Sequence, residues 1–259
     1  MRGAVMAVGA LARREMVRFF RERTRVVGAL LQPVMFWVFF SAGLGASFRP
    51  PGGTGPGYAA YLFPGTVVLI LLFTAIFSTI SVIEDRREGF LQGVLVAPVP
   101  RACIVLGKVL GGTALAVSQA VLVLLLAPLA GLRPGPLAIA GAIGVLALIG
   151  FALTALSFCI AWRMRSTQGF HAIMTVFLMP LWLLSGSFFP ADGAPAWLRA
   201  LIAADPLTYG VAFLRRLLLS GSGASDAGLP SAGLSLVATL LFGAVTFGCA
   251  LTLARRADR

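Results

Sequence analysis

The segment FPGTVVLILLFTAIFSTISVI, residues 63–83, has no charged side chain and is followed at once by EDRREG, residues 84–89. An apolar run of this length can cross the hydrocarbon core of a bilayer as a helix. One charge at the bilayer centre costs about 2.5–3.5 kcal/mol on insertion scales, so five consecutive charges indicate where the span ends. We therefore predict a transmembrane helix that runs into a charged segment at the membrane surface.

The composition places the whole chain in a membrane. Of its 259 residues, 59% are hydrophobic and 12% are charged, whereas soluble domains carry about 25% charged residues. The formal net charge is +12, but most basic side chains lie beside apolar runs. This placement favours the anionic membrane surface over nucleic acid as the partner of the positive charge.

Five further apolar runs resemble the first, and each is long enough to span a bilayer. We predict an all-α integral membrane protein with one domain, residues 1–259, and six transmembrane helices. The expected spans are residues 26–48, 63–83, 109–132, 137–162, 170–189 and 230–254. The fifth is interrupted by Pro180 and by Ser185-Gly186-Ser187, which a membrane tolerates where the backbone faces protein or a water-filled cavity.

Before the first span, Arg14, Arg18, Arg21 and Arg25 fall on one stripe of a helix. This pattern predicts an N-terminal amphipathic interfacial helix whose arginines reach the lipid headgroups. A solvated basic tail is the alternative.

Two short helical patterns, residues 195–203 and 206–219, lie between the fifth and sixth spans. Neither is long and apolar enough to cross, so we expect interfacial or re-entrant helices, anchored by Trp197 and Tyr209. At the start of the third span, Gly107 and Gly111 are four residues apart and form a small-residue face suited to close helix packing.

Six spans place both termini on one side of the membrane. Of the 21 lysines and arginines, 16 lie in segments on that side and five on the other. The positive-inside rule then assigns the termini and the charged segment to the cytoplasm.

The sequence carries no constellation for catalysis. The one Gly-Lys pair, Gly107-Lys108, lacks the glycine spacing and the following Ser or Thr of a phosphate loop. The single histidine, His171, cannot build a metal site with distant cysteines, and none of the expected spans contains a carboxylate. We predict no catalytic residues and no metal site, and the pattern argues against a self-powered pump or an enzyme.

The charged segment continues into a short mixed helix with an apolar stripe at Phe90, Leu91, Val94 and Leu95. This helix could lie in a partner's groove, or its apolar face could rest on lipid. The residues alone leave both possibilities open.

Several short motifs, spread in order over almost the whole chain, resemble those of the permease subunits of bacterial ABC-2 type exporters. These permeases include drug, polysaccharide and lipo-oligosaccharide exporters. The matching features are the Arg-rich start, Phe63-Pro64-Gly65, Glu84-Asp85-Arg86-Arg87-Glu88-Gly89, Ala97-Pro98-Val99-Pro100-Arg101, Gly107-Lys108, and Phe189-Pro190 before Asp205-Pro206-Leu207-Thr208-Tyr209.

The resemblance implies a permease that forms the substrate path of an exporter in the bacterial cytoplasmic membrane, with both termini cytoplasmic. It implies a second permease copy, in a homodimer, and two separate ATP-binding subunits. ATP and magnesium would bind those subunits, and this chain would hold no cofactor. The residues after the second span would form a cytoplasmic coupling helix seated in the ATPase. The coupling residues would be Glu84, Asp85, Arg86, Arg87, Glu88, Gly89 and Phe90.

The resemblance also implies that the second and fifth spans line the path and that residues 190–229 form an outer lid. Phe73, Phe77, Met174 and Phe177 would then face the path. The alternative function is a self-contained channel or secondary carrier that needs no ATPase.

Overall fold

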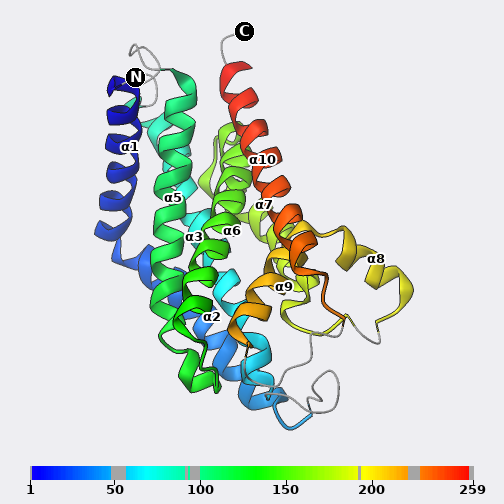
Figure 1. Cartoon of the computed structure of the whole chain (residues 1–259). Coiled ribbons are helices and arrows are strands. Elements are labelled where there is room, and N and C mark those ends of the chain that lie inside the picture. The colour runs from blue at the N-terminus through cyan, green and yellow to red at the C-terminus, as the bar shows by residue number, and fades with distance from the viewer. Residues whose placement is uncertain are drawn as a thin grey trace.

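The computed structural model describes residues 2–47, 57–90, 93, 100–191, 194–220 and 228–256, and within these ranges it contains helices and turns but no strand. Figure 1 shows the helices gathered into one bundle, with both termini at the same end. The helices are α1 (Arg2–Arg21), α2 (Arg23–Leu44), α3 (Tyr58–Arg87), α5 (Arg101–Leu124), α6 (Pro136–Arg163), α7 (Thr167–Trp182), α8 (Ala196–Ala204), α9 (Pro206–Leu218) and α10 (Ala232–Arg256), with a 3-10 turn η1 (Ala127–Ala130) and a π-turn η2 (Leu183–Ser187).

Six of these helical segments are long and apolar enough to cross a membrane: α2, α3, α5, α6, α7 continued through η2, and α10. They correspond one to one with the six expected spans. The all-α class is therefore confirmed, and the chain is a multi-pass membrane protein.

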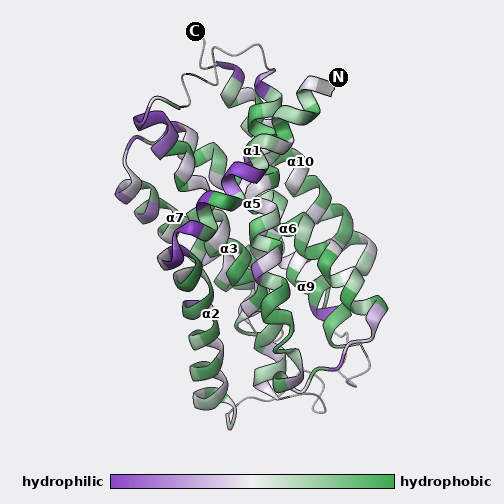
Figure 2. Ribbon diagram, turned by 90° about the vertical axis from the view of Figure 1, so that its left-hand side faces the viewer, coloured by the Kyte–Doolittle hydropathy of each residue, from purple (hydrophilic) through white to green (hydrophobic). Residues whose placement is uncertain are grey.

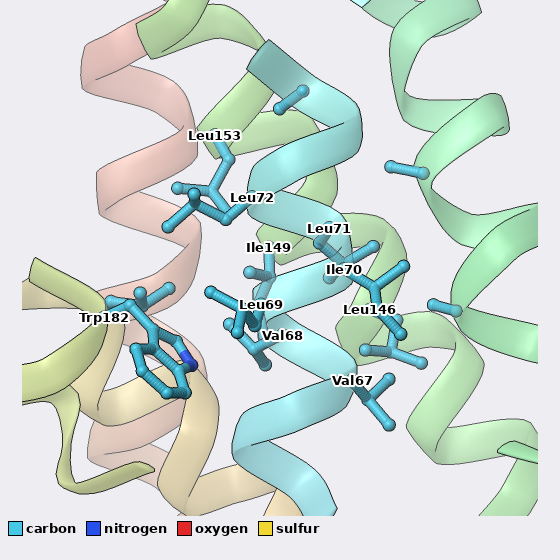
Figure 3. Close-up of a cluster of buried hydrophobic side chains, with 14 of the residues drawn as sticks. Val67, Val68, Leu69, Ile70, Leu71, Leu72, Leu146, Ile149, Leu153 and Trp182 are labelled. Carbon is cyan, nitrogen blue, oxygen red and sulfur yellow. The ribbon is translucent and has the colours of Figure 1, made fainter. Parts of the chain in front are cut away.

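Helix α3 lies at the centre of the bundle. It is apolar on all sides, as expected for a helix enclosed by others. In its most apolar 18-residue stretch, 89% of the residues are buried. Figure 3 shows Leu69 and Leu72 of α3 beside Ile149 and Leu153 of α6, with Trp182 of α7 on the same side. A displacement of α3 would thus be felt by α2, α5, α6 and α7, all of which contact it.

Helices α2 and α10 lie at the periphery. In their most apolar 18-residue stretches, only 17% and 22% of the residues are buried. Their outward side chains are nevertheless apolar: Phe39 is 64% exposed and Leu241 is 62% exposed. In Figure 2, where the ribbon is coloured by hydropathy, α2 is hydrophobic along most of its length. Such surfaces fit hydrocarbon or another protein and would be costly in water.

The bounds of two spans differ most from those expected. Helix α3 begins at Tyr58 and continues through the charged residues to Arg87, and α5 begins at Arg101 instead of residue 109. Pro100 fixes the start of α5, and at its other end η1 with Gly131, at φ +78°, ends the helical path before residue 132. The extra turns carry charges that are paired inside the protein, as described below.

The two short helices between the fifth and sixth spans are observed as α8 and α9. Trp197 of α8 is 66% exposed, whereas α9 packs against α6, α10 and η2. The side chain of Asp205 accepts a hydrogen bond from the amide of Leu207 and caps α9, with Pro206 at the first helical position. Their placement at a membrane interface remains a prediction.

The expected interruption of the fifth span is also observed. Helix α7 contains Pro180 and passes into the π-turn η2, where Gly186 has a left-handed φ of +73°. A residue with a Cβ rarely adopts this conformation, so glycine is required here. The break turns backbone carbonyls toward neighbouring helices.

Candidate functional site

The N-terminal helix α1 packs mainly along the first turns of α5. A Cβ added to Gly107 would lie 2.8 Å from Cβ of Leu11, and one added to Gly111 would lie 3.0 Å from Cβ of Glu15. The predicted small-residue face therefore exists, and the helix that it admits is α1. This close approach brings the carboxyl group of Glu15 toward Lys108.

Asp85 is the centre of a buried cluster of charges. Its side chain is 0% exposed and accepts two hydrogen bonds from Arg14, at 2.7 and 3.0 Å, and one from Arg18 at 2.7 Å. Lys108 also donates to Asp85 and, at 2.8 Å, to Glu15. Three basic side chains from two helices, α1 and α5, thus converge on one carboxylate of α3.

Glu84 extends this cluster toward α2. It accepts hydrogen bonds from Arg18 at 2.9 Å and from Arg25 at 2.5 Å. The contact of Glu88 with Arg18 is longer, at 3.4 Å, and the side chain of Glu88 is 59% exposed. We call this cluster the charged junction, and its members are Arg14, Glu15, Arg18, Arg25, Glu84, Asp85 and Lys108.

The charged junction corrects part of the N-terminal prediction. Arg14, Arg18 and Arg25 were expected to reach lipid headgroups, but all three bind carboxylates of α3. Of the predicted arginine stripe, Arg21 is the member with an exposed side chain and no carboxylate partner among the described residues. The helical stripe was correctly predicted, but helical periodicity identifies a face and not what covers it.

The basic residues of the same motif bind backbone at the end of α6. Arg86 donates to the carbonyls of Trp162 and Met164, at 2.5 and 3.1 Å, and Arg87 donates to the carbonyl of Arg165 at 2.8 Å. Cations are favourable at a helix C-terminus, where carbonyls lack intrahelical partners. The arginines therefore fasten the turn between α6 and α7 to α3.

The motif ends where α3 ends. Gly89 has φ +76°, which terminates the helix, and the ring of Phe90 lies 3.7 Å from the guanidinium carbon of Arg14. The rest of the predicted coupling helix, at residues 91–92 and 94–96, lies outside the described residues. Residues 84–90 thus join α1, α2, α5 and α6 to α3, and the exposed members are Arg87, Glu88 and Phe90.

The four residues expected to face a path differ in their contacts and exposure. Phe73 and Phe77 stack along α3 with ring centroids 6.3 Å apart, and Phe77 contacts His171 edge-on at 5.5 Å. Met174 is fully buried, whereas Phe177 is 53% exposed. A small pocket beside the charged junction reaches Phe77.

Sequence reasoning missed Glu15 and Lys108 as members of a site. The signal was available: a lysine two turns into an apolar helix needs a carboxylate partner, and Glu15 is one of the few acids in the chain. Within the described ranges, no group of three or more His, Cys, Asp or Glu residues could hold a metal ion.

A second polar cluster ties α3 to η2 at the end of the bundle away from the charged junction. Tyr58 donates to the carbonyl of Phe188 at 3.1 Å, and Trp182 donates to the carbonyl of Gly65 at 2.7 Å. A Cβ on Gly65 would lie 2.5 Å from Cβ of Ser187. The Pro64-Gly65 pair noted in the sequence therefore permits contact between α3 and the broken end of α7.

Six apolar spans, with α3 at their centre and buried charges at one end, define a multi-pass helical membrane protein. A model of the ABC-2 type transporter family matches residues 6–219. The chain therefore belongs to this family, whose members are the membrane permease subunits of ABC transporters and not the ATPase itself.

Two of the similar proteins below are named as ABC transporter permeases. The chain is 24% identical over 86% of its length to "Daunorubicin resistance ABC transporter permease protein DrrB1" of Streptomyces coeruleorubidus, covering 80% of that protein. It is 30% identical over 77% of its length to "Probable multidrug ABC transporter permease YbhR" of Escherichia coli K12, covering 53% of that protein. It is 27% identical over 76% of its length to "Nodulation protein J" of Sinorhizobium fredii, covering 75% of that protein.

Proposed function

We propose that this ABC-2 permease acts as one half of a homodimer in the bacterial cytoplasmic membrane. Its termini face the cytoplasm, and two ATP-binding subunits hold ATP and magnesium. The chain itself supplies the path and the mechanical link and carries no cofactor. The observation that supports this proposal best is the junction of residues 84–90 with four helices at the end of the bundle where both termini lie.

In this proposal the ATPase contacts the outward side of residues 84–90. Glu88 and Phe90 are exposed and lie beside the undescribed residues of the expected coupling helix, whereas Arg87, also exposed, is bound to the carbonyl of Arg165. Glu84, Asp85 and Arg86 instead transmit the displacement, because they hold α1, α2, α5 and α6 to α3. Paired charges resist separation, so these helix ends would move together.

A second copy would complete the path. The outward faces of α2 and α7 are apolar, with Val38 48% and Val176 76% exposed, so they suit a protein partner as well as lipid. Phe73, Phe77, Met174 and Phe177 remain the proposed path residues, because they lie on α3 and α7.

The proposal is tested by reconstituting the permease in liposomes with and without its ATP-binding subunit. Transport that requires the subunit and hydrolysable ATP is the expected result. Transport by the permease alone would instead support a self-contained channel or secondary carrier. A variant with Glu88→Ala and Phe90→Ala should lower both transport and the stimulation of ATPase activity while the permease remains folded.

A further inference from the structure

Arg215 of α9 is a buried arginine that binds no carboxylate among the described residues. Its guanidinium donates to the carbonyl of Gly186 at 2.8 Å and lies 4.0 Å from the centre of the Tyr61 ring. A longer contact of 3.4 Å reaches the carbonyl of Tyr61, and the buried Nε has no hydrogen-bond partner. A full positive charge is thus held by neutral acceptors and an aromatic ring alone.

The carbonyl of Gly186 is available because the backbone is broken there. The π-turn and the left-handed φ of +73° at Gly186 take this carbonyl out of a regular helix. It accepts hydrogen bonds from both Arg215 and the hydroxyl of Tyr61, the latter at 3.0 Å. One carbonyl at the end of α7 therefore joins α3 and α9; we call Tyr61, Gly186 and Arg215 the carbonyl junction.

Two members of the carbonyl junction, Tyr61 and Gly186, lie on α3 and at the end of α7, the helices that carry the proposed path residues. Tyr61 is three turns before Phe73 on α3, and Gly186 follows Phe177 beyond the break in α7. Gly65 and Ser187 touch at the same level, where no room remains for even one methyl group. Within this chain, α3 and the end of α7 are therefore closed against each other at the end farther from the termini.

The bonding of Arg215 favours a contact that can open. Burial removes the guanidinium from water, and its contacts with neutral carbonyls and a ring compensate for only part of the lost hydration free energy. If α9 moves away from η2, water can hydrate the arginine, which offsets much of the loss of these bonds. A carboxylate partner would add a strong attraction that opposes this separation.

We propose that Arg215 is a latch that keeps the far end of the path between α3 and α7 closed, and that its release from the Gly186 carbonyl opens that end for the cargo to leave. This inference rests on the proposed transport function. It adds a positioning residue on α9, which belongs to the segment expected to form the outer lid.

The test measures access to the contact itself. Ser187 is fully buried beside Gly65, so a cysteine placed there reports opening when a membrane-impermeant maleimide is added on the side opposite the termini. The host is the full permease in proteoliposomes, with Cys103, Cys159 and Cys249 replaced by alanine. Arg215→Met should raise the labelling rate of Ser187→Cys by at least about tenfold, because charge-assisted hydrogen bonds are lost.

Arg216→Met is the matched control. Arg216 neighbours Arg215 on α9 but donates to the carbonyl of Pro230, at 3.2 Å, so this change should leave labelling within about twofold of the parent rate. Equal labelling of the parent and of folded Arg215→Met protein would overturn the latch.

Tyr61→Phe is the second test of the latch, to be used if the Arg215→Met protein does not fold. This change removes one donor to the Gly186 carbonyl and keeps the ring under Arg215, so labelling should rise about threefold to tenfold. Unchanged labelling in folded Tyr61→Phe protein would reject the proposal. The assay uses no ATPase subunit, so its outcome is independent of the transport test of the proposed function.

Discussion

The charged junction and the carbonyl junction are both buried, both include basic side chains and both bind α3, but they stabilise their cations differently. Lys108 and Arg14 meet carboxylates, whereas Arg215 meets backbone carbonyls and a tyrosine ring. Separating Lys108 and Arg14 from their carboxylates has to overcome the attraction between opposite charges, while separating Arg215 from neutral acceptors has to overcome only weaker contacts with dipoles and a ring. The comparison indicates that one end of α3 is built to stay joined to its neighbours and the other to come apart.

The largest predicted effect is that of Asp85→Asn, which removes the central negative charge of the charged junction. Lys108 and Arg14 would then lack their main compensation, and the free energy of unfolding should fall by about 3–5 kcal/mol. Thermal unfolding of the permease in nanodiscs measures the loss.

Glu88→Gln is the matched control, because its contact with Arg18 is exposed and should be worth less than about 1 kcal/mol. Similar small losses in both variants would show that the charged junction is not a strong tie.

The sequence predicted the spans well because each is an uncharged run of sufficient length, and that property belongs to the segment itself. It misplaced the start of α5 because Lys108 was treated as a charge outside the membrane. Only the approach of Glu15 and Asp85, which depends on tertiary packing, lets the helix continue around this lysine.

The candidate site was predicted less completely. The motif at residues 84–90 was found, but its coupling role is still a prediction, and its arginines proved to bind the end of α6. From the sequence, Arg215 was only one of the five basic residues placed on the side opposite the termini. No local pattern shows that it will bind a backbone carbonyl freed at Gly186.

A second prediction concerns the packing that brings α1 to the charged junction. Gly107→Ala would place a methyl group 2.8 Å from Leu11 and should cost about 1–3 kcal/mol of stability through overpacking. The measurement is the same unfolding assay, combined with limited proteolysis of α1.

Gly144→Ala serves as its control, since a Cβ at Gly144 in α6 meets nothing within 4 Å. There the higher helix propensity of alanine should stabilise by about 0.5–1 kcal/mol. A stabilising Gly107→Ala would refute the close contact of α1 with α5.

A third prediction concerns the pH dependence of stability near the carbonyl junction. Burial raises the pKa of Asp205, the cap of α9, from 3.8 to about 7, so the folded protein prefers the neutral carboxyl group. Its contribution to stability is complete below pH 3.8 and is lost as the pH rises through about 7. The Leu207 amide favours the charged form, but burial outweighs it. The shift of the pKa from 3.8 to about 7 corresponds to a net loss of about 2–3 kcal/mol between pH 5 and pH 8.

Unfolding midpoints of the parent and of Asp205→Asn at the two pH values measure this effect. Asparagine cannot ionise and should remove the difference between the two pH values at this position. A parent protein that becomes more stable by the same amount at pH 8, in a manner abolished by Asp205→Asn, would reverse the predicted sign.

The most direct test of the central claim, that force enters this permease at residues 84–90, is crosslinking to the ATP-binding subunit in the assembled transporter. A cysteine at Glu88 carries a heterobifunctional crosslinker, and Leu137→Cys, 87% exposed at the other end of α6, is the control. We predict a crosslink to the ATP-binding subunit from position 88 and none from position 137. A functional transporter that crosslinks to this subunit from position 137 but not from position 88 would contradict the claim.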